Sequence, residues 1–306
     1  MKRLDHRALI ASLSDAQRES LLTRSDAAGL RQIALHWGAI LVTGGLVLLE
    51  APFQPLLILL QGILIVFLFT ALHETIHKTA FRSAGLNNAV ARICGFLLVL
   101  PPDWFRYFHF AHHRHTNDPA RDPELAGPKP DGPGAYLWYL SGLPLWASHL
   151  RKLFVNAAGR NRDTFVPPKG AVKIRREARI FLALYAAIIG LSVILQSDAA
   201  IRVWLLPALV GQPFLRAYLL AEHTRCPQVS DMLENSRTTF TGFLVRFLAW
   251  NMPYHAEHHA FPAVPFHRLA AFHALARPHL KITERGYGRF HLGLIKALIG
   301  KPEATA

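Results

Sequence analysis

The sequence predicts an all-α membrane protein with four transmembrane helices in two hairpins and a cytosolic helical cap. Of the 306 residues, 51% are hydrophobic, the mean hydropathy is +0.20, and the apolar residues are concentrated in long runs. Four runs approach the ~20 residues that a helix needs to cross ~30 Å of hydrocarbon. They are 33–49 and 53–72 in the first hairpin, and 180–195 and 199–220 in the second. Long, nearly uninterrupted apolar runs of this kind are typical of membrane-spanning helices and not of the core of a soluble domain.

Basic residues are distributed unevenly around these runs. The predicted turns at 50–52 and 196–198 contain no Lys or Arg, whereas the N-terminal, central and C-terminal segments contain nearly all of them. Because short loops rich in Lys and Arg stay in the cytoplasm, both termini and every histidine cluster described below are expected on that side. Residues 1–32 are polar and lack the apolar core of a secretory signal. We therefore expect an integral protein of a bacterial-type inner membrane.

We expect the chain to form one membrane-embedded domain over residues 1–306. Its predicted parts are a polar N-terminal tail (1–32), a first hairpin (33–72), a cytosolic or interfacial segment (73–179), a second hairpin (180–220) and a cytosolic cap (221–306). In the central segment, 94–100 is apolar but too short to span and ends at Pro101-Pro102. Residues 135–150 have the aromatic and Leu content of one helix lying in the membrane interface.

The charge and the cysteines restrict the possible partners. A net charge of +14 would suit a nucleic-acid-binding protein, but basic residues such as Arg151, Lys152 and 169–179 lie beside apolar segments. Attraction to anionic headgroups, about 1 kcal/mol per basic residue, explains that placement with fewer assumptions, so no nucleic-acid partner is expected. Cys94 and Cys226 are too few for a disulfide framework and fit a reducing compartment.

Histidine is the most informative residue type in this chain. Eight imidazoles fall in three clusters, two of which share the spacing His-x-x-His-His: His73 and His77; His109, His112 and His113; His255, His258 and His259. At helical spacing the members of a cluster lie on one face. Eight imidazoles are too many for one tetrahedral zinc and suit two metal ions that share a site. The sequence therefore predicts a dinuclear metal centre.

Two other functions fit part of this pattern. His73-Glu74-Thr75-Ile76-His77 matches the His-Glu-x-x-His signature of zinc peptidases, in which Glu is the general base. A mononuclear peptidase needs only one further ligand, however, and would leave most of the other histidines without a role. A metal carrier or transporter would scatter its ligands along a transmembrane path, and here they gather at helix ends and in cytoplasmic segments. Seven other histidines are interpreted as solvated side chains: His36, His115, His149, His267, His273, His279 and His291.

The three clusters resemble the histidine boxes of the membrane fatty acid desaturase superfamily. The likeness includes Thr116-Asn117 after the second box, and Tyr254-His255-Ala256-Glu257-His258-His259 followed by Phe261-Pro262 as the third. It implies two non-haem iron ions held mainly by histidine. Family members often add a ninth histidine at the end of the last transmembrane helix, which here is His223. The acyl-CoA branch has an Asn one turn earlier, where this chain has Leu219. The first box has three intervening residues, not the four of the acyl-CoA branch, and this favours acyl chains on complex lipids or another lipid-soluble substrate.

The resemblance implies an O2-dependent oxidation of an unactivated C–H bond in a membrane lipid, most simply fatty acyl desaturation. Lipid hydroxylation, or hydroxylation and ketolation of a carotenoid, stays open on the same scaffold. Electrons are expected from a separate carrier, a ferredoxin or similar protein. Polar side chains close in sequence to the expected ligands should accept ring N–H bonds and orient the imidazoles. These are Glu74, Asp118, Asp122, Glu222, Glu257 and Asn251.

Overall fold

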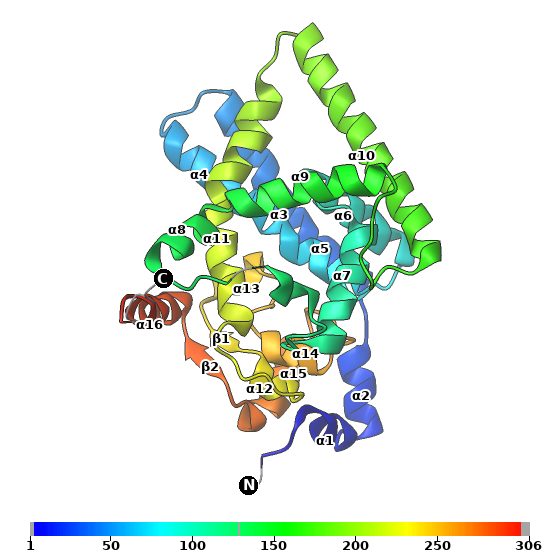
Figure 1. Cartoon of the computed structure of the whole chain (residues 1–306), viewed down its shortest axis with the longest axis vertical. Coiled ribbons are helices and arrows are strands. Elements are labelled where there is room, and N and C mark those ends of the chain that lie inside the picture. The colour runs from blue at the N-terminus through cyan, green and yellow to red at the C-terminus, as the bar shows by residue number, and fades with distance from the viewer. Residues whose placement is uncertain (1–2, 128, 301–306) are drawn as a thin grey trace. The chain divides into compact units, whose positions relative to one another are not determined.

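The computed structural model describes residues 3–127 and 129–300, which are mainly helical with two short strands (Figure 1). They divide into two compact units, each assembled from separate stretches of chain. The membrane unit comprises 26–110 and 142–215, and the histidine-rich unit comprises the described parts of 1–25, 111–141 and 216–306. Four helices, or continuous pairs of helices, are long and apolar enough to span a membrane: Asp15–Leu48, Gln54–Ile76, Pro168–Ile194 and Ile201–His223. The all-α membrane fold with four spans is thus confirmed.

Each span extends beyond its predicted apolar run because polar turns continue the helix. The span elements are α3 (Asp26–Leu48), α4 (Gln54–Val66), α5 (Leu68–Ile76), α10 (Pro168–Ile194), the π-helix η2 (Ile201–Leu205) and α11 (Leu206–His223). α4 and α11 touch through glycines: a Cβ on Gly62 would lie 2.1 Å from the Pro207 carbonyl oxygen, and one on Gly211 would lie 2.2 Å from the Gly62 carbonyl carbon. Small residues of this kind let transmembrane helices approach closely.

The apolar stretch 94–100 ends a helix, as its length and the following prolines predict. α6 (Ala84–Leu97) and α7 (Pro102–His115) are bent by 97° relative to each other across a short break, so together they form either one broken span or a re-entrant turn. Gly95 makes the turn possible, because a Cβ there would lie 2.5 Å from the Leu100 carbonyl oxygen. Pro102 supplies the first residue of α7, a position at which its missing N–H costs nothing.

The prediction of one interfacial helix over 135–150 is wrong. The segment forms two helices, α8 (Pro133–Ser141) and α9 (Leu143–Ala157), because Gly142 adopts a left-handed φ of +71°. A side chain at this glycine would also meet Gln212, with its Cβ 2.1 Å from Gln212 Cγ. In the membrane unit, α9 packs on α10 through a buried cluster that includes Leu153, Ala178 and Phe181.

The histidine-rich unit contains short elements around buried polar groups. They are α1 (His6–Ala11), α2 (Asp15–Leu22), η1 (Pro123–Ala126), α8, α12 (Met232–Asn235), β1 (Thr238–Phe240), α13 (Phe243–Leu248), α14 (His255–Ala260), α15 (Leu269–Ala276), η3 (Arg277–His279), β2 (Thr283–Arg285) and α16 (Tyr287–Ile299). β1 and β2 pair in parallel with Thr238 opposite Thr283. The start of the polar segment 1–32 forms α1 and α2, and the backbone N–H of His6 donates to Asp231 at 3.0 Å.

Candidate metal centre

Three of the expected ligands lie together inside the membrane unit. His73 is on the last turn of α5, His77 caps that helix, and His109 is on α7. The ring centroids of His73 and His109 are 4.3 Å apart, and that of His77 lies 5.1 Å from the first and 5.0 Å from the second. Phe105 packs beside His109, so the group has an apolar wall. α7 is tied to α5 by Arg106, whose guanidinium donates to the Ile76 carbonyl.

The other expected ligands gather in the histidine-rich unit. His112 and His113 end α7, His223 ends α11, and the third box forms α14. The ligand atoms of His112, His223 and His259 all lie within 4.8 Å of one another. His255 joins them, with its Nε2 2.9 Å from Nε2 of His223. Nε2 of His113 lies 3.2 Å from Nε2 of His258.

Four of these imidazoles have a polar group close to Nδ1, and in three of them, His112, His223 and His259, the contact is a hydrogen bond. His112 donates to Asp122 at 2.9 and 3.1 Å, and His223 donates to the Asn235 carbonyl at 3.2 Å. Nδ1 of His255 lies 3.2 Å from Glu222 Oε1. Nδ1 of His259 lies 3.1 Å from Thr116 Oγ1, whose own proton goes to the His112 carbonyl. Because each Nδ1 faces an acceptor, the Nε2 lone pairs point inward.

The inward-pointing Nε2 atoms are arranged as the ligands of a metal site would be. Nε2 of His112 and Nε2 of His223 are 3.2 Å apart. If both rings are neutral and carry their protons on Nδ1, the two Nε2 lone pairs face and repel each other. A cation bound between them removes that repulsion. Nε2 of His259 is buried with no hydrogen-bond partner among the described residues. Burial and the neighbouring imidazoles hold the pKa of His259 well below its ordinary value, which keeps it in the neutral, metal-binding form. The residues present therefore fit a histidine-bound metal.

The polar residues expected to orient the rings divide into two sets. Asp122 and Glu222 contact imidazoles as described above, and Glu74 is fully buried on α5. Asp118 instead pairs with the exposed Arg121 at 2.6 Å. Asn251 has a left-handed φ of 58° and donates to the Phe266 carbonyl, so it shapes the turn before α14. Glu257 accepts hydrogen bonds from Thr238 and His273, so its carboxylate holds neighbouring elements together.

Two of the histidines that were predicted to be solvated, His36 and His279, are buried. His36 is fully buried on α3, where its Nε2 lies 2.8 Å from the Leu64 carbonyl at the end of α4. His279 is buried, and its Nδ1 accepts from the Leu4 backbone N–H. His273 is the one that sequence reasoning missed at the site, since it holds the carboxylate between two expected ligands. No signal in its own neighbourhood distinguishes it, because its partner Glu257 lies on another helix.

Residues 50–291 match the profile of the family described as Fatty acid desaturase. The chain belongs to the fatty acid desaturase family. It is also 24% identical over 234 residues to dihydrorhizobitoxine desaturase of Bradyrhizobium elkanii, a match that covers 69% of this chain and 64% of that protein. Less than two thirds of the relative's length is therefore spanned.

Membership of the desaturase family confirms the resemblance found in the sequence. The four apolar helices and the family together indicate an integral membrane protein. A histidine-rich group able to hold a metal is present, as the family would require, in His112, His223 and His259.

Proposed function

We propose that this desaturase-family protein carries out an O2-dependent oxidation of an unactivated C–H bond in a membrane lipid, most simply the desaturation of a fatty acyl chain. The observation that supports this best is the set of four imidazoles whose Nδ1 atoms are anchored and whose Nε2 atoms converge. We propose two iron ions as the cofactor, with nine ligands drawn from the three boxes and α11: His73, His77, His109, His112, His113, His223, His255, His258 and His259. α7 carries ligands of both groups, His109 in the membrane unit and His112 and His113 in the other.

When bound, such an iron pair activates O2 with two external electrons and supplies the oxidising power for hydrogen abstraction. The residues of this chain contribute position and environment. Asp122, Glu222 and Thr116 fix ring orientation, so that the ligand atoms need not reorganise during turnover. Phe69 and Phe105, whose rings are 5.5 Å apart, border the histidines of the membrane unit and exclude water from that side.

The remaining parts of the proposal concern partners and orientation. We propose that the electrons come from a separate donor, a ferredoxin or similar protein. The uneven placement of Lys and Arg supports a bacterial-type inner membrane with both termini and the histidines on the cytoplasmic side.

The substrate is the most open part of this proposal. The relative's name gives its substrate as dihydrorhizobitoxine, so family membership is compatible with substrates other than acyl chains. Hydroxylation of a lipid, or hydroxylation or ketolation of a carotenoid, would use the same histidines. The outcomes differ only after the first hydrogen is removed, since loss of a second hydrogen gives a double bond and transfer of oxygen gives an alcohol.

The experiment is metal analysis combined with lipid profiling. The full chain, purified from membranes, should contain about two irons per protein, and cells that express it should gain an oxidised lipid. His112→Ala should lose both iron and product with the fold retained, whereas His115→Ala on the same helix should keep both. About one zinc and no iron would contradict the proposal and favour the peptidase alternative. In that case Glu74→Gln should abolish peptide hydrolysis while leaving the metal bound.

A further inference from the structure

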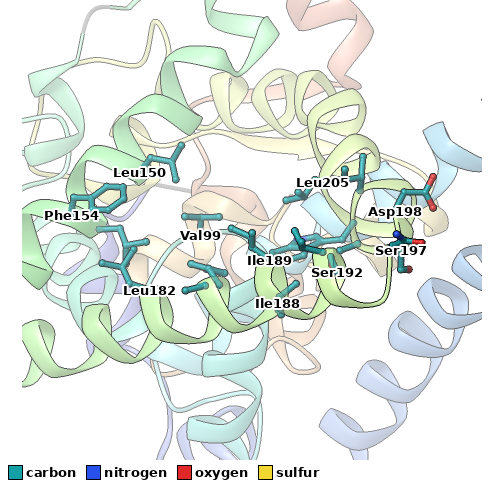
Figure 2. A pocket seen from close by; sticks show the side chains of 18 residues that line it. Val99, Leu150, Phe154, Leu182, Ile188, Ile189, Ser192, Ser197, Asp198 and Leu205 are labelled. Carbon is teal, nitrogen blue, oxygen red and sulfur yellow. The ribbon is translucent and has the colours of Figure 1, made fainter.

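A large apolar cavity lies within the membrane unit, and no histidine is among its lining residues. α10 and η2 meet at the turn 195–200 and diverge from it, and α9 crosses the opening between them (Figure 1). The cavity between these three elements has a volume of about 930 Å³. Figure 2 shows it extending from Leu150, Phe154 and Leu182 at one end to Ser197 and Asp198 at the other. We call it the α10 groove.

The α10 groove has the dimensions and walls of a site for an alkyl chain. Along α10 the lining residues follow one helical face from Leu182 through Ile189 to Val193, a rise of roughly 16 Å out of ~30 Å of hydrocarbon. Ile189 is 66% exposed and therefore packs against nothing in this chain over most of its surface. A wall of this kind inside a bilayer is covered by lipid or by another chain.

Aromatic rings form a rigid floor for the groove. Tyr185 donates its hydroxyl to the Phe96 carbonyl at 2.7 Å, and Trp204 donates Nε1 to the Leu97 carbonyl at 2.8 Å. The ring of Phe96 stacks against both, at centroid distances of 4.4 and 5.5 Å. The polar atoms of both lining rings are thus satisfied by the end of α6, and their apolar faces are held ready for a ligand.

Positive charge without an ion-pair partner is concentrated at one end of the groove. The segment 151–179 contains nine Lys and Arg and two acidic residues. Arg151 follows the lining residue Leu150, and Arg179 lies one turn before Leu182 with its Nε fixed on the Ala157 carbonyl at 2.9 Å. Arg175 is one turn further from the groove on α10. All three are exposed, and they form no ion pair within the described part of the chain. The opposite end has Asp198 as its only charged lining residue.

We propose that the α10 groove binds an anionic glycerophospholipid, with an acyl chain along α10 and the phosphate at Arg151, Arg175 and Arg179. Apolar length and a cationic end match an anionic amphiphile, whereas a zwitterionic lipid would gain less from three unpaired guanidinium groups. A second copy of the chain is a poor fit, because it would bring the same basic cluster against itself. The proposal does not depend on the reaction that the histidines carry out.

The test is native mass spectrometry of the full chain in detergent, titrated with phosphatidylglycerol or with phosphatidylcholine of the same acyl chains. We expect one phosphatidylglycerol to be retained, with several-fold preference over phosphatidylcholine. Replacing Arg151, Arg175 and Arg179 together by Gln should weaken its binding about tenfold or more. The matched control replaces the exposed Arg24, Arg277 and Arg285 by Gln, which changes the net charge equally and should leave binding unchanged.

A second pair of variants tests the apolar part of the groove. Ala186 lines the cavity and its neighbour Ala187 does not, and both are exposed on α10. Ala186→Trp should fill the groove and release the lipid, while Ala187→Trp should retain it. Equal retention of both lipids, or binding that none of these variants alters, would mean non-specific annular lipid and overturn the proposal. A dimer that Ala186→Trp disrupts would overturn it too, since the groove would then be an interface between copies.

Discussion

His273 on α15 donates its Nδ1 proton to the carboxylate of Glu257, which is fully buried on α14 between His255 and His258. The other carboxylate oxygen accepts from the hydroxyl of Thr238 on β1. The ring of Tyr254 stacks on His273 at a centroid distance of 4.5 Å. Glu257 thus joins the third histidine box to α15 and β1, and the position of two proposed ligands depends on a residue that binds no metal itself.

The first prediction concerns His273→Ala. Removing the ring leaves a buried carboxylate oxygen without its donor, which should lower the free energy of unfolding by about 1–3 kcal/mol. Because α14 is then less well held, the purified protein should also contain less iron. His273→Asn, which can still present an N–H to Glu257, should recover part of both. The measurements are thermal unfolding in detergent and metal content; if Ala and Asn behaved alike, the hydrogen bond would have no special role.

The second prediction compares two aspartates in one loop. Asp122 accepts from His112 and from the backbone N–H of Asn117, both buried, whereas Asp118 pairs with the exposed Arg121. Asp122→Asn should weaken metal binding by about 10- to 100-fold, because the charge that orients the His112 ring is lost. Asp118→Asn should have little effect, since exposed ion pairs contribute little. Iron retained during dialysis against a chelator measures both; equal retention would remove Asp122 from the site.

Local sequence features predicted the spans and the helical histidine boxes. A run of about 20 apolar residues favours a membrane-spanning helix whatever its neighbours are. The i, i+3, i+4 spacing alone places His109, His112 and His113 on one side of α7. The hydropathy and the histidine spacing are properties of each segment alone, so helices predicted from them do not depend on contacts with distant residues.

Features that depend on distant partners were missed. Gly142 divides the expected interfacial helix because Gln212 occupies the space that a side chain would need. The pairing of Thr238 with Thr283, and that of Glu257 with His273, join segments whose approach no local pattern encodes. In the sequence, His36 is a single polar residue in an apolar run, with no sign of its partner. Only the folded structure shows that it faces the Leu64 carbonyl.

The third prediction concerns the pH dependence of the N-terminal helices. Burial raises the pKa of Asp231, but hydrogen bonds from the His6 and Leu233 backbone N–H groups and from Lys281 outweigh it and hold the pKa below its ordinary value. A carboxyl whose pKa is depressed by folding stabilises the folded state above its unfolded pKa of about 3.9, and this contribution is lost as the pH falls through the folded value. Stability should therefore decline in acid below about pH 4.

The test of this prediction is Asp231→Asn, which should lower stability near pH 7 and flatten the acid decline. Asp15→Asn, at an exposed position in α2, should do neither. Limited proteolysis across the pH range can follow the release of α1, whose His6 contacts Asp231. An unchanged acid decline in Asp231→Asn would assign the decline to other carboxylates.

The fourth prediction concerns the helix contact between α4 and α11. A Cβ on Gly62 would lie 2.1 Å from the Pro207 carbonyl oxygen and 2.9 Å from the Gly211 backbone nitrogen, so the two backbones would have to separate. Gly62→Ala should therefore destabilise the protein by about 1–3 kcal/mol. Gly190→Ala on α10 is the matched control, since nothing lies within 4 Å of a Cβ there. It should be neutral or slightly stabilising, because Ala has the higher helix propensity. Thermal unfolding in detergent distinguishes them: if Gly62→Ala were as stable as Gly190→Ala, α4 and α11 could not be in backbone contact in the membrane.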